Sequence, residues 1–238
     1  MTRNINKRFD KIKIFYDGTN IIKYGTLDYI SGFTTNTTLM KSSNNLNYHS
    51  FYEKNEDLIN NRCISMQVFR DTDSDIYNDA KLISAYGNNV YVKIPIIKSN
   101  GNSNINIIKR LLDEGIKVNI TAIFTEKQLL EIYDNINVDT KVIVSIFSGR
   151  ISDTCVNPCN IVEFGCKLFS NRDNIEILWA GCKDNLSLQH AINCGCDIIT
   201  IPDSIIDRLS RVDTDLEKMS LETVYSFNKD GVEGNIII

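Results

Sequence analysis

Eight short runs rich in apolar and β-branched residues recur along the chain, and helical patterns separate the later ones. The runs are KIKIFYD (11–17), SGFTTN (31–36), CISMQVF (63–69), VYVKIP (90–95), VNITAI (118–123), KVIVSIF (141–147), IEILWAG (175–181) and CDIITIP (196–202). Apolar residues fall at helical spacing in 106–115, 126–136 and 186–195. Strands that alternate with helices form parallel β-α units. Eight units, about one per 26 residues, favour a (β/α)8 TIM barrel, and a doubly wound open sheet is the alternative.

Polar side chains within these runs favour the barrel. Asn119 and Thr121 share one parity of their strand, as do Ser65 and Gln67, while Ser145 stands between two apolar neighbours. Successive side chains of a strand point to opposite faces. Both faces of an open parallel sheet lie under helices, where unpaired polar groups are costly. In a barrel, one parity points inward and converges on the active-site mouth.

The C-terminal part of the chain continues this helical pattern. A helix is predicted from Ser204 through SIIDRLSRV, and a last helix over 220–231 is predicted to end at Gly231. Gly115 and Gly195 follow apolar-periodic stretches, where a helix C-cap belongs. No Pro- or Ser-rich linker divides the sequence. We therefore expect residues 1–238 to form a single barrel domain with a C-terminal helix.

Composition and charge exclude several classes of protein. The chain has 238 residues, a net charge of −4 and no apolar run that approaches the ~18 residues of a membrane span. Mild acidity argues against nucleic-acid binding, because phosphate contacts need a basic surface. The basic start lacks the apolar core of a signal peptide. We expect a protein without nucleic-acid or membrane partners.

The cysteines and histidines provide little catalytic chemistry. Seven cysteines, an odd number, occur without a secretion signal, which favours a reduced, cytoplasmic protein. Cys155 and Cys159 lie in a C-x3-C spacing near Cys166. A zinc site requires a tetrahedral set of Cys or His ligands in closely spaced pairs, so we expect no metal. His49 falls in a polar loop and His190 in a helical stretch, neither beside a nucleophile motif. Acid–base work is therefore expected from carboxylates or lysine.

Lys93 is the most informative residue, because it interrupts the otherwise apolar run VYVKIP. It could be an edge-strand lysine whose ammonium reaches water. Alternatively, it points inward and acts as an amine nucleophile. Burial disfavours the charged form and lowers a lysine pKa from ~10.4 towards ~7–8, which frees the amine to attack a carbonyl. The product would be a Schiff base with a ketone or aldehyde.

Other polar positions at strand ends have both structural and functional interpretations. Asp17 ends IFYD and could cap a turn or transfer protons near an imine. The segment 33–38 is dense in small polar side chains, as a strand end with a helix cap would be. Arg150 could form a surface salt bridge or clamp a phosphate bidentately. No G-x-G pair occurs, so dinucleotide and P-loop fingerprints are absent and no cofactor is expected.

Six motifs in order resemble those of the transaldolase family, including its short fructose-6-phosphate-aldolase-like branch. They are IFYDGTN (14–20), GFTTNTT (32–38), VYVKIP (90–95), NITAIFTEKQ (119–128), SIFSGR (145–150) and CDIITIP (196–202). The likeness spans about residues 12 to 231. Each motif is weak alone, but six in family order at matching strands form a strong signal. The resemblance implies a cofactor-free enzyme of carbohydrate metabolism, such as the pentose phosphate reactions.

The resemblance also implies roles for the matching positions. Lys93 would form the Schiff base, and Asp17 would be the acid–base group for carbon–carbon cleavage. Thr121 with Gln67 would position the catalytic water. The residues implied in binding the sugar and its phosphate are Thr34, Asn36, Asn119, Ser145, Phe147, Arg150 and Lys183.

The sequence departs from the family pattern at informative places. Phe147 matches transaldolases, whereas aldolase-like members usually carry Tyr; Gln67 matches aldolase-like members, whereas transaldolases tend to have Glu. Thr37 replaces the proline that follows T-T-N. The seventh strand usually ends in A-S, but here Gly181 takes the serine's place and Lys183 follows. Loss of that hydroxyl removes one phosphate contact.

The leading hypothesis is therefore a transaldolase that moves a dihydroxyacetone unit between sugars or sugar phosphates. The alternatives are an aldolase or lyase acting on a related or unusual sugar, and an inert barrel that binds a sugar phosphate. Short family members often assemble through their last helix, so a homo-oligomer is also expected.

Overall fold

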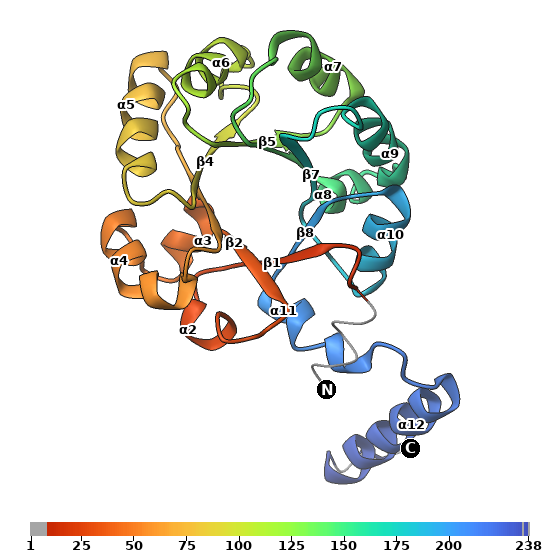
Figure 1. Ribbon diagram of the computed structural model, residues 1–238. Coiled ribbons are helices and arrows are strands. Elements are labelled where there is room, and N and C mark those ends of the chain that lie inside the picture. Colours follow the sequence, from red (N-terminus) through yellow and green to blue (C-terminus); the bar gives the residue numbers. More distant parts are fainter. Residues whose placement is uncertain (1–8, 235, 238) are drawn as a thin grey trace.

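The computed structural model describes residues 9–234 and 236–237, and its eight parallel strands close into a barrel in chain order (Figure 1). This confirms the TIM barrel and excludes the doubly wound sheet. The strands are β1 (Lys13–Asp17), β2 (Ile30–Thr34), β3 (Cys63–Gln67), β4 (Val90–Pro95), β5 (Val118–Ile123), β6 (Val142–Ile146), β7 (Ile175–Trp179) and β8 (Ile198–Ile201). Strand β1 pairs with both β2 and β8, which closes the ring.

Helices surround the barrel and connect successive strands (Figure 1). They are α2 (Ile21–Tyr24), α3 (Thr37–Ser42), α4 (Tyr48–Ile59), α5 (Asp73–Ser84), α6 (Ile105–Asp113), α7 (Glu126–Asn135), α8 (Ser148–Ser152), α9 (Pro158–Leu168), α10 (Leu186–Cys194), α11 (Asp203–Ile206), the 3-10 helix η1 (Leu209–Arg211) and α12 (Leu216–Glu233). The glycines after α6 and α10, Gly115 and Gly195, adopt the left-handed conformation, as predicted for helix C-caps.

Two apolar clusters hold the barrel together. The larger one lies between the outer faces of the strands and the helices, and includes Val92, Ile94 and Ile120. The smaller one fills the barrel's interior with Phe15, Ile143, Leu178, Ala180 and Ile198. The inner cluster shares the interior with polar side chains, because Ile143 pairs in register with Asn119 and Leu178 with Ser145.

A glycine makes room for the inner cluster. A Cβ atom at Gly32 on β2 would lie 2.6 Å from the ring of Phe15 on the neighbouring strand β1. No ordinary contact is that short, so the large Phe15 ring can fill the barrel only because Gly32 carries no side chain. This pair sits directly beneath Asp17 and Thr34 in the same two strands.

Strand β5 contains a bulge next to the predicted site. The register against β6 shifts between Ile120 and Ile123, and Ala122 adopts a φ of 60°. A left-handed alanine is strained by roughly 1–2 kcal/mol. The bulge returns Ile123 to the outer apolar cluster, so Thr121 keeps its place at the mouth while the strand still packs against the helices.

Three sequence-based predictions were wrong in their details. The helix expected from Ser204 is two short pieces, α11 and η1. The last helix starts earlier than predicted and continues through Gly231 to Glu233, because one glycine costs a helix only about 1 kcal/mol. His49 lies in helix α4, since Asn47 accepts a hydrogen bond from the Ser50 amide and caps a helix where a polar loop was expected.

The C-terminal helix differs from the others in its surroundings. Helix α12 extends away from the barrel (Figure 1), and none of its residues is buried. Leu221, Val224 and Tyr225 stand at i, i+3 and i+4 and are 70%, 59% and 70% exposed. The helix therefore presents an apolar stripe that the barrel of its own chain leaves uncovered.

Candidate active site

Lys93 points into the barrel from the middle of β4. The side chain is 5% exposed, and its Nζ atom donates a hydrogen bond of 3.4 Å to the carbonyl oxygen of Thr35. Strand β4 lies between β3 and β5 in a closed ring, so the edge-strand interpretation of this lysine is wrong. Burial lowers the pKa of Lys93 below its usual value, and the charge of Asp17 opposes that shift only in part.

The carboxylate of Asp17 lies at the end of β1 and is held by hydroxyl groups. Thr34 on β2 donates a hydrogen bond of 2.7 Å to Asp17 Oδ1. The same Thr34 oxygen lies 2.6 Å from the hydroxyl of Thr200 on β8. The structure thus brings an acid and a buried amine into electrostatic contact inside one barrel mouth, as predicted for Asp17 and Lys93.

A second polar layer crosses the barrel from β3 to β6. Asn119 donates a 3.0 Å hydrogen bond to Ser65 and accepts one of 2.7 Å from Ser145. All three side chains are buried, and each has a partner. Because this network is satisfied, it fixes the amide of Asn119 beside Lys93, its register neighbour on β4.

Two hydroxyl groups near Lys93 lack such partners. The Oγ1 atoms of Thr121 and Thr35 are buried and make no hydrogen bond among the described residues. An unpaired buried hydroxyl is unfavourable, so both groups are available to bond to a ligand or a water. Gln67 pairs in register with Lys93 from the other side and is half-buried.

Asn36 follows β2 and has a structural task as well. Its Oδ1 atom accepts a hydrogen bond of 3.0 Å from the Leu39 amide, which caps helix α3. The capping interpretation of this segment is therefore confirmed. Since the cap uses the oxygen alone, the Nδ2 donor of the partly buried side chain is left for other contacts.

The residues predicted to bind phosphate lie after β6 and β7. Arg150 is exposed, and its guanidinium lies 5.7 Å from the centre of the Phe147 ring. Lys183 is exposed and forms an ion pair of 3.2 Å with Asp153. Gly181 has a φ of 73°, a conformation that a serine adopts only with strain. The backbone conformation at position 181 therefore suits glycine, the residue found here in place of the family's serine.

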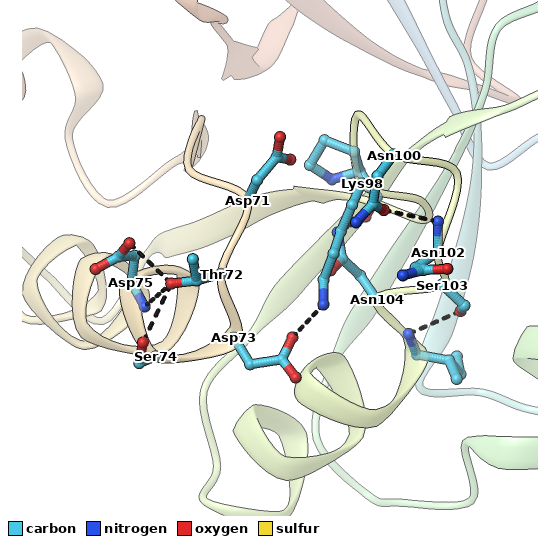
Figure 2. A network of polar contacts seen from close by, with 12 residues as sticks. Asp71, Thr72, Asp73, Ser74, Asp75, Lys98, Asn100, Asn102, Ser103 and Asn104 are labelled. Carbon is cyan, nitrogen blue, oxygen red and sulfur yellow. Dashed lines mark hydrogen bonds and ion pairs between the residues drawn. The ribbon is translucent and has the colours of Figure 1, made fainter.

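A hairpin-like loop after β4 forms part of the rim near Lys93. Residues Ile97 and Ser103 pair as an antiparallel bridge, and Gly101 makes the turn with a φ of 84°. Lys98 in this loop forms an ion pair of 2.6 Å with Asp73 at the start of α5 (Figure 2). The loops after β3 and β4 are therefore linked, and Lys98 carries its charge in an ion pair at the rim.

Within residues 9–234 and 236–237, no group of three or more His, Cys, Asp or Glu side chains could hold a metal ion. In the same ranges, no helix has the length and apolarity that a membrane span requires. All seven cysteines are free thiols.

A (β/α)8 barrel with a buried lysine and a carboxylate in its mouth defines the class of this protein. The profile of the Transaldolase/Fructose-6-phosphate aldolase family matches residues 8–233, so the chain belongs to that family. A probable transaldolase of Nitrosopumilus maritimus is 29% identical over 92% of this chain and 94% of its own. A probable transaldolase of Syntrophobacter fumaroxidans is 30% identical over 84% and 89%, and one of Methanococcus maripaludis is 28% identical over 87% and 95%.

Three residues of this constellation were not predicted from the sequence: Ser65 as a partner of Asn119, Thr35 beside Lys93, and Thr200. Thr200 could have been found, because it interrupts the apolar run CDIITIP as Lys93 interrupts VYVKIP. The contact of Lys93 with Thr35 is through a backbone carbonyl, which no residue type reveals.

Proposed function

We propose that this protein is a Schiff-base transaldolase that transfers a dihydroxyacetone unit between sugar phosphates. The observation that carries the proposal is Lys93: an amine 5% exposed, inside the barrel, with its pKa lowered by burial and a carboxylate within electrostatic reach. A neutral amine attacks a carbonyl, whereas an ammonium has no lone pair to do so. Family membership supports the same chemistry.

The reaction follows from the groups in the mouth. The Lys93 amine adds to the ketose carbonyl carbon, and loss of water gives a protonated imine. Asp17 accepts the proton of the hydroxyl next to the bond that breaks. That bond's electron pair flows into the imine, which releases the aldehyde half and leaves a three-carbon enamine on Lys93. The enamine attacks an acceptor aldehyde, Asp17 returns the proton, and water frees the new ketose.

The neighbouring side chains have roles that their bonding supports. The Nδ2 group of Asn36 donates to a substrate hydroxyl, while its oxygen caps α3. Thr121, whose hydroxyl lacks a partner among the described residues, holds the water of imine hydrolysis together with Gln67. Asn119 and Ser145 line the sugar path with Thr34. Arg150, packed near the ring of Phe147, binds the phosphate with Lys183.

An aldolase that cleaves its donor without an acceptor is the second candidate. Gln67 favours it by family resemblance, and the weak phosphate end supports a related or unusual sugar. Lys183 is already paired with Asp153, and Gly181 offers no hydroxyl. An inert sugar-phosphate-binding barrel is less well supported, because Lys93, Asp17 and Thr34 are all in place.

Borohydride trapping tests the proposal. The protein is incubated with fructose 6-phosphate or dihydroxyacetone, reduced, digested and mapped by mass spectrometry. We expect a three-carbon adduct on Lys93, none in Lys93→Met, and a normal adduct in Lys98→Met, the matched rim lysine. Adding an acceptor aldehyde should accelerate donor consumption for a transaldolase and leave it unchanged for an aldolase. Absence of an adduct with every ketose, or turnover by Lys93→Met, would refute the Schiff-base reaction.

The proposal also covers the oligomeric state and the cellular location of the protein. We infer a homo-oligomer in which a second copy covers the apolar stripe of Leu221, Val224 and Tyr225 on α12. Light scattering should report a multiple of the chain mass, and Tyr225→Glu should lower it. The free thiols support a reducing, cytoplasmic location. We also propose that residues 1–238 form a single domain.

A further inference from the structure

Three side chains from three adjacent strands form a continuous chain of hydrogen bonds in the barrel. Asp17 ends β1, and Thr34 on β2 and Thr200 on β8 lie on the two strands that flank it. The two threonine oxygens are 2.6 Å apart, and Thr34 is 2.7 Å from the carboxylate. Thr200 is 3% exposed, so its hydroxyl finds its partners within the protein.

Counting hydrogen atoms assigns a direction to this chain. Each threonine hydroxyl has one hydrogen to donate, and an ionised carboxylate can only accept. Thr34 therefore gives its hydrogen to Asp17, and Thr200 must supply the hydrogen between the two threonines. When Asp17 is protonated, its own O–H donates to Thr34, and Thr34 turns its hydrogen towards Thr200. The chain can thus serve both protonation states of Asp17.

We propose that Thr200 is a positioning residue for proton transfer by Asp17, acting through Thr34. This rests on the proposed function, in which Asp17 exchanges a proton with the substrate. In the ionised state, the Thr200 hydroxyl donates to Thr34 and strengthens the charge-assisted bond that Thr34 makes to the carboxylate. Thr200 therefore favours the ionised form of Asp17 and holds the carboxylate in one orientation.

The charged surroundings of Asp17 make this effect measurable. Lys93 on β4 interacts electrostatically with Asp17. At this height, β2 and β8 contribute the hydroxyls of Thr34 and Thr200. Tyr16 on β1 belongs to the outer apolar cluster, and its hydroxyl bonds to the Asn20 amide and Asp203. Loss of the Thr200 hydroxyl should therefore reach Asp17 through Thr34, the residue that bonds to both.

The test compares Thr200→Val, which keeps the shape and removes the hydroxyl, with Thr200→Ser, which keeps the hydroxyl. The probe is cleavage or transfer of fructose 6-phosphate between about pH 5 and pH 9. We expect Val to move the acid limb of kcat/KM upwards by roughly half a pH unit and to lower kcat more than it raises KM. Ser should restore the wild-type profile. A carbon-13 titration of the Asp17 carboxyl should show the same upward shift without any turnover.

The outcomes separate this inference from the function on which it rests. Suppose that wild-type protein forms the Lys93 adduct, and that Thr200→Val keeps the wild-type acid limb of kcat/KM, the wild-type kcat and the wild-type titration of Asp17. Thr200 then has only a structural role. The inference is also overturned if Thr200→Val lowers the thermal stability but leaves the acid limb of kcat/KM where it is in wild type. If wild type forms no adduct, the function itself fails, and the carboxyl titration then shows whether Thr200 still tunes Asp17. A folded Ser variant with the Val profile contradicts the hydroxyl relay.

Discussion

Three consecutive residues of β4 show how one strand serves two regions of the molecule. Val92 and Ile94 are fully buried in the apolar cluster under the helices, while Lys93 between them faces the barrel mouth. The same division holds on β5, where Ile120 packs outward and Asn119 and Thr121 face inward. The outer region holds the barrel together by apolar packing, whereas the inner region also holds polar groups, which are costly to bury without partners.

The difference teaches where stability and chemistry can be separated. Outer positions contribute through buried apolar area, so their loss should be felt in unfolding and little in turnover. Inner positions carry charges and hydroxyls that are costly to bury, so their loss should be felt in turnover and little in unfolding. Four substitutions on β1, β4 and β5 test this separation.

The largest effect is expected at Asp17, in the inner region. Asp17→Asn removes the proton acceptor but keeps a side chain that Thr34 can hydrogen-bond. General acid–base catalysis contributes typically 10²–10⁴-fold, so kcat should fall by about that factor while the unfolding free energy changes little. Steady-state kinetics and urea unfolding measure the two quantities. Asp73→Asn, at the rim beside Lys98, is the control and should keep kcat near wild type. Wild-type kcat in Asp17→Asn would remove Asp17 from the mechanism.

Neighbouring residues on β5 provide the next comparison. Ile120→Ala deletes buried methyl groups from the outer cluster and should lower the free energy of unfolding by about 2–5 kcal/mol. Thr121→Ala, one residue later, removes a hydroxyl that has no partner among the described residues and should cost less. Turnover per folded molecule should show the opposite order, with the larger loss in Thr121→Ala. Equal losses of stability in the two variants would contradict the division between the faces.

The sequence predicted the inner region better than its surroundings. Parity along the strands favoured an inner position for Asn119 and Ser145, and the interrupted run VYVKIP singled out Lys93, because a polar residue inside an apolar run is visible in one dimension. The partners of those residues come from other strands, so the link from Asp17 to Thr200 required the ring to close. Helix ends were less predictable. Gly231 was expected to end α12, but the helix continues through it to Glu233. No residue pattern indicated that α11 ends at Ile206.

The smallest change is expected in the stability of Lys93→Met, and it should depend on pH. Burial holds the pKa of Lys93 below its unfolded value, so the unfolded chain binds more protons between the two values, and stability rises with pH in that interval. The unfavourable burial of the charge is therefore fully present below the folded pKa and is lost as the pH approaches about 10.5. Methionine carries no charge, so the variant should be more stable than wild type at neutral pH, and the two should converge as the pH rises. Urea unfolding at pH 7 and pH 10 measures this; Lys98→Met, which loses an ion pair at the rim, should show no such gain. A constant difference across that range would mean that Lys93 is not held neutral by burial, and the separation between the two faces of β4 would then rest on shape alone.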